Sequence, residues 1–144
     1  MNVQHILDAK PIAGVTTISP DAALSDAAAL LAGQRIGALV MQTDAGELSG
    51  ILSERDLVRE LARRGTACLE LRVAHVMTRK IVTCAPGDSA ESVLAKMTEG
   101  RFRHMPVVSG AAMVGLISIG DVVKARIDDL AMEKSALEGM IMGF

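Results

Sequence analysis

The sequence predicts a mixed α/β (α+β) fold, built from two β-α-β-β-α units that pack with pseudo-twofold symmetry. The first observation behind this prediction is an internal repeat, because the segment 50–57 (GILSERDL) recurs at 115–122 as GLISIGDV. The flanking segments repeat at nearly the same offset: Thr17 and Thr83 are 66 positions apart (83 − 17) and Asp56 and Asp121 are 65 apart (121 − 56). Half of the 144 residues are hydrophobic, so two units can share the core that neither would build well alone.

The first unit is expected over residues 10–66, after a short helical or irregular lead-in. Val15 to Ile18 is short and β-branched, which is typical of a strand. Asp21 is expected to cap the following helix, which Gly33 would end. The remaining elements are the helix itself at 22–33, strands at 38–41 and 48–52 around a turn at 44–46, and a helix at 53–64 with Leu57, Val58 and Leu61 facing inward.

The second unit is expected over residues 74–130 and repeats the same order after a linker at 66–80. Its last helix should begin after Ser118 and run to about Leu137, longer than its counterpart, with an apolar stripe. Residues 131–144 then form a C-terminal helical extension. The other expected elements are a strand at 81–83, a helix at 88–99, and strands at 104–108 and 113–117.

Composition disfavours several classes of function. The net charge of −2 and the presence of only two aromatic residues, Phe102 and Phe144, argue against nucleic-acid binding. No apolar run approaches a membrane span and the N-terminus lacks a secretory pattern, so we expect a cytoplasmic protein that does not enter a membrane. Cys68 and Cys84 stand far apart and the three histidines are scattered, so no metal site is expected.

Catalysis is not expected either. The sequence contains no Gly-x-Ser-x-Gly segment and no Gly-x-x-x-x-Gly-Lys-Ser/Thr loop. A hydrolase or transferase would need a nucleophile with a base and an orienting group, or a metal. We therefore predict no enzyme and no catalytic cofactor.

The repeated Ser-x-x-Asp segments, Ser53 to Asp56 and Ser118 to Asp121, allow two interpretations. Each can be a capping box, in which serine and aspartate satisfy backbone groups at a helix start. Alternatively, hydroxyl, carboxylate and free helix amides can hold a ribose and its phosphate. The occurrence of the motif twice, each time after a Gly-apolar-apolar strand end, favours the second interpretation.

These segments, together with His104-Met105-Pro106-Val107-Val108 and Val76-Met77-Thr78, resemble a tandem pair of CBS domains over about residues 10–130. The resemblance implies that Asp56 and Asp121 hold the ribose of an adenine nucleotide and that Ser53 and Ser118 meet ribose or phosphate. It also implies that the first strands offer backbone groups to the base. The remaining candidates for ligand binding are Val15, Thr17, Ala38, Arg55, Thr78, Ile81, Thr83, Arg103, His104, Met105 and Pro106.

The two copies differ, which predicts two unequal sites. Arg103 and His104 are expected to supply polar groups to one cleft, whereas Gly37 and Ala38 stand at the same place in the first copy. Arg55 either supplies phosphate charge or is a solvated residue of the first helical turn. His104 is either a phosphate contact or a pocket-wall imidazole.

The resemblance implies a standalone regulatory or sensor module that binds AMP, ATP or NAD(H) between its units. Its expected partners are a second copy, through helices, and an effector protein whose identity the sequence does not indicate. The long C-terminal helix is a candidate contact surface, or it folds back on its own core. The alternative function is a dimerisation scaffold that binds no ligand.

Overall fold

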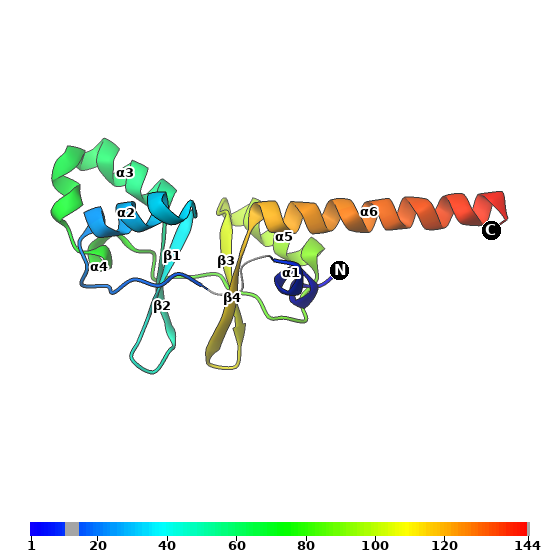
Figure 1. Ribbon diagram of the computed structural model, residues 1–144, viewed down its shortest axis with the longest axis horizontal. Coiled ribbons are helices and arrows are strands. Elements are labelled where there is room, and N and C mark those ends of the chain that lie inside the picture. The colour runs from blue at the N-terminus through cyan, green and yellow to red at the C-terminus, as the bar shows by residue number, and fades with distance from the viewer. Residues whose placement is uncertain (11–14, 144) are drawn as a thin grey trace.

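The computed structural model describes residues 1–10 and 15–143 and shows the expected repeat of elements (Figure 1). Each half contains a helix, a two-stranded antiparallel hairpin and a second helix. The first half comprises α2 (Leu24–Gln34), β1 (Ala38–Gln42), β2 (Leu48–Ser53) and α3 (Glu54–Arg64). The second comprises α5 (Ala90–Gly100), β3 (His104–Ser109), β4 (Ala112–Ser118) and α6 (Ile119–Met142). Between and before them lie α1 (Val3–Ala9), η1 (Gly65–Glu70) and α4 (Val73–Val76).

The two hairpins lie side by side at the middle of the molecule and have matching registers (Figure 1). Ala38 pairs with Ser53 in the first hairpin, and His104 pairs with Ser118 in the second. Each hairpin therefore ends at the serine that begins the following helix. This register places the start of one strand beside the N-terminus of a helix in both halves.

The prediction that each unit begins with a full strand is wrong. In its place the structure has one parallel bridge per unit, Thr17 to Val40 and Cys84 to Val107. Pro20 and Pro86 follow within three residues, and a proline has no N–H with which to continue a ladder. The mixed helix and strand class is nevertheless confirmed, with two small sheets.

Three details of the helices also differ from expectation. Asp21 does not cap α2, because Ala23 occupies the N-cap and makes no side-chain hydrogen bond there. The helix continues past Gly33 and ends where Arg35 adopts a left-handed conformation (φ 54°). On α3, Val58 and Leu61 are exposed, and only Leu57 of the three predicted inward residues is buried.

Each hydrophobic core is completed by a segment from outside its own repeat. The link between the halves completes the first core, and the N-terminal helix completes the second. Cys68, Val73 and Met77, from the link between the halves, are buried with α2, β1, β2 and α3. Val3 and Ile6 of α1 are buried with the second half. The glycine of each repeat allows this packing, since a Cβ on Gly50 would collide with the Met77 side chain and one on Gly115 with Leu7.

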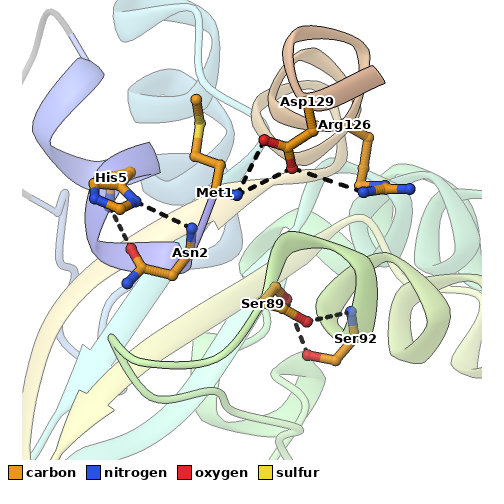
Figure 2. A network of polar contacts seen from close by, with 7 residues as sticks. All are labelled: Met1, Asn2, His5, Ser89, Ser92, Arg126 and Asp129. Atoms are coloured by element: carbon orange, nitrogen blue, oxygen red, sulfur yellow. Dashed lines mark hydrogen bonds and ion pairs between the residues drawn. The ribbon is translucent and has the colours of Figure 1, made fainter. Parts of the chain in front are cut away.

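Polar contacts hold α1 against the second half (Figure 2). The N-terminal ammonium of Met1 lies 3.0 Å from a carboxylate oxygen of Asp129 on α6, which Arg126 also approaches at 3.7 Å. Asn2 caps α1 by accepting the His5 backbone N–H at 3.0 Å. The N-terminal helix is therefore an integral part of the second unit.

The last helix, α6, extends to Met142, beyond the predicted end near Leu137. Figure 1 shows that its outer half projects past α1 and α5. Across residues 1–10 and 15–143, no helix combines the length and apolar character that crossing a membrane would require.

Candidate functional site

Both Ser-x-x-Asp segments form capping boxes, as the first interpretation predicts. At α3, the Asp56 backbone N–H donates to Ser53 Oγ (3.3 Å), and the Ser53 backbone N–H donates to Asp56 Oδ2 (2.9 Å). At α6, the matching distances between Ser118 and Asp121 are 3.2 and 2.9 Å. The capping role does not consume the whole carboxylate, because Asp56 Oδ1 still faces Arg59 at 3.3 Å. Each aspartate is thus fixed in orientation by its serine, with acceptor capacity left over.

A cleft of about 420 Å³ opens between the two halves, beside the start of α3. This volume lies within the range of small-molecule sites, roughly 300–1,000 Å³. Its walls come from the end of β2 and the first turns of α3, from the chain that follows α4, and from the turn between α5 and β3. The lining residues are Ile51, Ser53, Glu54, Arg55, Asp56, Arg59, Thr78, Lys80, Ile81, Val82, Gly100, Arg101, Phe102, Arg103 and His104.

Backbone pairing holds the linker wall of the cleft in place. The Ile51 N–H donates to the Thr78 carbonyl at 3.0 Å, and the Thr78 N–H donates back to the Ile51 carbonyl at 2.8 Å. This short bridge attaches the link between the halves to β2. The chain from Thr78 to Val82 therefore runs past the start of α3 and faces Asp56 across the cleft.

Positive charge dominates the cleft although the whole chain is slightly acidic. Five cationic side chains line it, against the two carboxylates of Glu54 and Asp56. Positive charge in a concave site raises the local concentration of anions. The α3 N-terminus adds partial positive charge and backbone N–H groups at the same place. The five cations are Arg55, Arg59, Lys80, Arg101 and Arg103.

Apolar side chains form the remainder of the wall. Ile51, Ile81, Val82 and Phe102 line the same cleft as the charges. An apolar patch next to a cationic patch suits a ligand with a planar base at one end and a phosphate at the other. The arrangement offers a carboxylate for hydroxyl groups between these two ends.

His104 lies where the two halves touch. A Cβ on Gly37 would come within 2.8 Å of His104 Cε1, so the imidazole packs directly on the Gly37 backbone. Burial lowers the pKa of His104 below its usual value, although the nearby Glu54 and Asp121 carboxylates act in the opposite direction. A neutral ring is consistent with the pocket-wall role considered from the sequence.

The structure brings about half of the sequence-predicted residues together in this cleft and places the rest elsewhere. Met105 is buried in the core of the second half, whereas Pro106 on β3 and Ala38 on β1 are buried but belong to neither core. Val15, Thr17 and Thr83 are not among the lining residues, and Ser118 and Asp121 lie at the start of α6. The predicted residues that do line the cleft are Ser53, Arg55, Asp56, Thr78, Ile81, Arg103 and His104.

The sequence did not indicate which aspartate shares a cleft with the charge of the second copy. Arg103 and His104 belong to the second copy of the repeat, yet they line the cleft that contains Asp56 of the first copy. The pseudo-twofold packing is the reason, since it sets the start of β3 opposite the start of α3. The phosphate charge and the first carboxylate are therefore partners across the halves.

Several lining residues were not predicted from the sequence. Arg59, Lys80, Arg101 and Phe102 contribute most of the additional charge and apolar surface. Arg101 did carry a signal, because it repeats Arg35 at an offset of 66 (101 − 35) and both residues adopt the left-handed conformation. Lys80 carried none, since it lies in the linker between the two copies.

At the other aspartate, Asp121, the carboxylate pairs with a lysine from outside its own helix. Lys10 Nζ lies 3.0 Å from Asp121 Oδ2 and donates to the Leu116 carbonyl at 2.8 Å. Burial alone would raise the pKa of Asp121, but hydrogen bonds from Ser118 and Lys10 and the charge of Lys10 outweigh burial and hold that pKa below its usual value. By the repeat offset, the counterparts of Thr78 and Lys80 are residues 12 (78 − 66) and 14 (80 − 66), which lie outside the described residues.

Comparison with known proteins agrees with the repeat. The family model for the CBS domain matches residues 4–63 and 73–128. A CBS-domain containing protein from Agrobacterium tumefaciens is 41% identical with a TM-score of 0.83, and the match covers 88% of this chain and 99% of that one. The CBS domain pair of protein MJ0100, solved in complex with 5′-methylthioadenosine and S-adenosyl-L-methionine, shares the fold at 24% identity, with a TM-score of 0.77, 90% of this chain and 98% of that one covered.

A relative from Arabidopsis thaliana, the mitochondrial CBS domain-containing protein CBSX3, is 32% identical over 127 residues. That match covers 85% of this chain and 62% of the relative. The chain thus spans less than two thirds of that relative's length, and 23% of another Arabidopsis relative, CBSCBSPB2.

Proposed function

The chain belongs to the CBS domain family, and from this premise we propose that it is a regulatory module that binds an adenosine nucleotide in the cleft beside Asp56. The observation that carries the proposal is the gathering of a fixed carboxylate, a helix N-terminus and five cations in one cleft between the halves. Each of these groups matches one part of a nucleotide.

In the proposed complex, Asp56 accepts hydrogen bonds from the ribose hydroxyls. Its capping contacts with Ser53 keep the carboxylate in place before the ligand arrives, so little ordering entropy is lost on binding. The phosphate lies against the α3 N-terminus and the arginines, where charge-assisted hydrogen bonds are strongest. The base packs on the apolar wall formed by Ile81, Val82 and Phe102.

AMP, ADP, ATP and NAD(H) all contain this base, ribose and phosphate. The excess of cations over carboxylates in the cleft favours ligands with phosphate over adenosine alone. The adenosine ligands of protein MJ0100 support the general class of compound, since that protein shares the fold. Titration with AMP, ADP and ATP measures how many phosphates the cleft prefers.

A ligand in this cleft would contact both halves at once. Asp56 and Arg59 belong to the first half, and Arg101 and Arg103 to the second. Binding that bridges two halves stabilises the relative orientation in which both sets of contacts are made. The proposed output is a shift in the angle or stiffness between the halves, which a second copy or an effector protein would detect.

We test the proposal by isothermal titration of the full chain with AMP, ADP, ATP, NADH and adenosine. The Asp56→Asn variant keeps a side-chain oxygen for the cap with Ser53 but loses the negative charge that would accept hydrogen bonds from the ribose. The binding free energy should therefore weaken by about 1.5–3 kcal/mol. Asp121→Asn is the matched control, because it makes the same change at the equivalent capping box. We expect the control to bind the phosphate-bearing ligands as the parent chain does.

Two results would contradict the proposal. Absence of heat and of any melting-temperature increase with all five ligands would favour the non-binding scaffold, since a ligand at 100 times its dissociation constant adds about 2.7 kcal/mol of stability. Equal loss of affinity in both aspartate variants would place binding elsewhere. Recovery of chemically unchanged ATP and NADH after incubation separates binding from an enzymatic function.

A further inference from the structure

One exposed apolar line runs along α6 and plays no part in the nucleotide cleft. Its members recur at alternating intervals of four and three residues, which is the spacing of positions a and d in a coiled coil. We call this line the α6 seam. It consists of Val123, Ile127, Leu130, Lys134, Leu137 and Ile141, and the exposed fractions of its five apolar members range from 39% to 83%.

The seam lies on the face of α6 that the chain's own core does not use. Val122 and Ala125 are the buried residues of the helix, and Asp129 binds the Met1 ammonium. These three positions follow one another on a single face at intervals of three and four residues. Val123 and Ile127 fall between them in sequence, the other seam residues follow Asp129, and all are exposed, so packing within the described residues leaves the seam uncovered.

The outer part of α6 has little to support it within the described residues. From Leu130 to Met142 every side chain is exposed, and Figure 1 shows this part projecting beyond the body of the molecule. It extends for about 20 Å at 1.5 Å per residue. Isolated helices shorter than about 12–15 residues are marginal in water, and most helical stability in proteins comes from packing an apolar face.

We propose that the α6 seam pairs with the seam of a second copy of this chain as a two-stranded antiparallel coiled coil. Charge decides the orientation. In a parallel pair, Lys134 would lie against Lys134 of the second copy, and Glu133 would face Glu138 of the second copy. Like charges at these places disfavour the parallel arrangement.

The antiparallel pair removes the contact between the two Lys134 residues, and it replaces the two contacts between Glu133 and Glu138 with a single one between the Glu133 residues of the two copies. Lys134 then lies level with Leu130 of the second copy, where its methylene stem packs while its ammonium reaches solvent. Lys124 faces Glu138 of the second copy at both ends of the coil, which gives two attractive pairs. Among the described residues, Glu138 has one ion-pair contact, with Lys134 at 3.9 Å, and that contact lies on the exposed outer part of α6.

The pairing rests on and extends the proposed regulatory function, because it connects the nucleotide-binding halves of one chain to a second copy. Since α6 begins at Ile119, directly after β4, its direction depends on the orientation of the second half. A change of angle between the halves would reach the second copy through this helix. Assembly itself needs no nucleotide, so its failure would leave the binding proposal untouched.

The first experiment measures the mass of the full chain, without nucleotide, by sedimentation equilibrium. The parent chain should be a dimer, and Leu137→Glu should raise the dimer dissociation constant by at least roughly tenfold, because a charge replaces an apolar seam residue in each chain. Met132→Glu is the matched control. Met132 is 67% exposed on the same helix but lies off the seam, so this variant should remain dimeric.

The second experiment tests orientation by charge exchange. Glu138→Lys should weaken the dimer, and adding Lys124→Glu should restore it. These two positions are about 21 Å apart along one helix, so restoration requires contact between copies. Disulfide-linked dimers of Ile141→Cys that form in high yield would indicate a parallel pair and overturn the proposal. A monomeric parent chain, or a dimer that Leu137→Glu leaves intact, would also overturn it and assign the seam to another protein.

Discussion

The Lys10 ammonium lies 3.0 Å from the Asp121 carboxylate, at the position that repeats the Asp56 carboxylate of the open cleft. Lys10 comes from the N-terminal segment, which packs with the second half through α1. The Asp56 carboxylate therefore lies in a cleft lined by five cations, one of which, Arg59, is 3.3 Å from it, whereas Asp121 pairs with a lysine from the N-terminal segment. This difference turns two similar sequence motifs into two unequal environments.

Replacement of Lys10 by methionine should free Asp121 for a ligand. We expect titration with ATP to reveal a second ligand per chain, while the loss of a partly exposed ion pair lowers the free energy of unfolding by about 1 kcal/mol. Lys80→Met is the control, because it removes a lysine from the other cleft and should weaken the first site without adding a second. An unchanged number of ligands in the Lys10 variant would show that the ion pair does not block the site.

His104 should make folding stability depend on pH near neutrality. Burial lowers its pKa in the folded chain below the 6.5 of the free side chain; the nearby carboxylates act against this shift, and the nearby cations act with it. The neutral form is thus favoured on folding. Stability from this residue is present above pH 6.5 and is lost as pH falls through the lowered value. The charged groups that act on it are Glu54, Lys10, Asp121 and Arg103.

Urea unfolding at several pH values would check this expectation. The parent chain should lose stability as the pH falls below about 6.5, and His104→Gln should lose less over the same interval. If the two chains show the same pH dependence, His104 does not supply it. A bound phosphate should favour the protonated ring, so nucleotide binding near pH 6 should take up protons.

Gly37 is expected to tolerate no side chain. A Cβ at this position would lie 2.8 Å from His104 Cε1, so Gly37→Ala should destabilise the chain by about 1–3 kcal/mol through crowding between the halves. Gly33→Ala provides the control in α2, where a Cβ would meet nothing within 4 Å. That variant should gain about 0.5–1 kcal/mol from helix propensity. Thermal unfolding of both variants measures the contrast, and a stable Gly37→Ala chain would contradict the packing described.

Arg101 and Arg35 form a matched pair for separating charge from backbone strain. Both adopt the left-handed conformation (φ 56° and 54°) at helix ends, which costs a non-glycine residue about 1–2 kcal/mol. Replacement of either by glycine should therefore stabilise the chain similarly. Only Arg101→Gly should weaken nucleotide binding, since Arg101 alone lines the described cleft. Equal affinities in the two variants would remove Arg101 from the proposed site.

The sequence by itself determined the local structure and the repeat. Both capping boxes, both hairpins and the order of helices follow from short-range patterns, because their hydrogen bonds join residues close in the chain. It also determined family membership, since the motifs that carry it repeat in register.

Only the tertiary structure decided how the halves combine. The sequence did not predict that Val3 and Ile6 complete the second core, that Arg101 and Arg103 face Asp56, or that Lys10 reaches Asp121. These contacts join residues far apart in the chain, and their geometry depends on how two packed units are oriented. A periodic pattern specifies which face of a helix or strand is buried, but not which distant segment covers it.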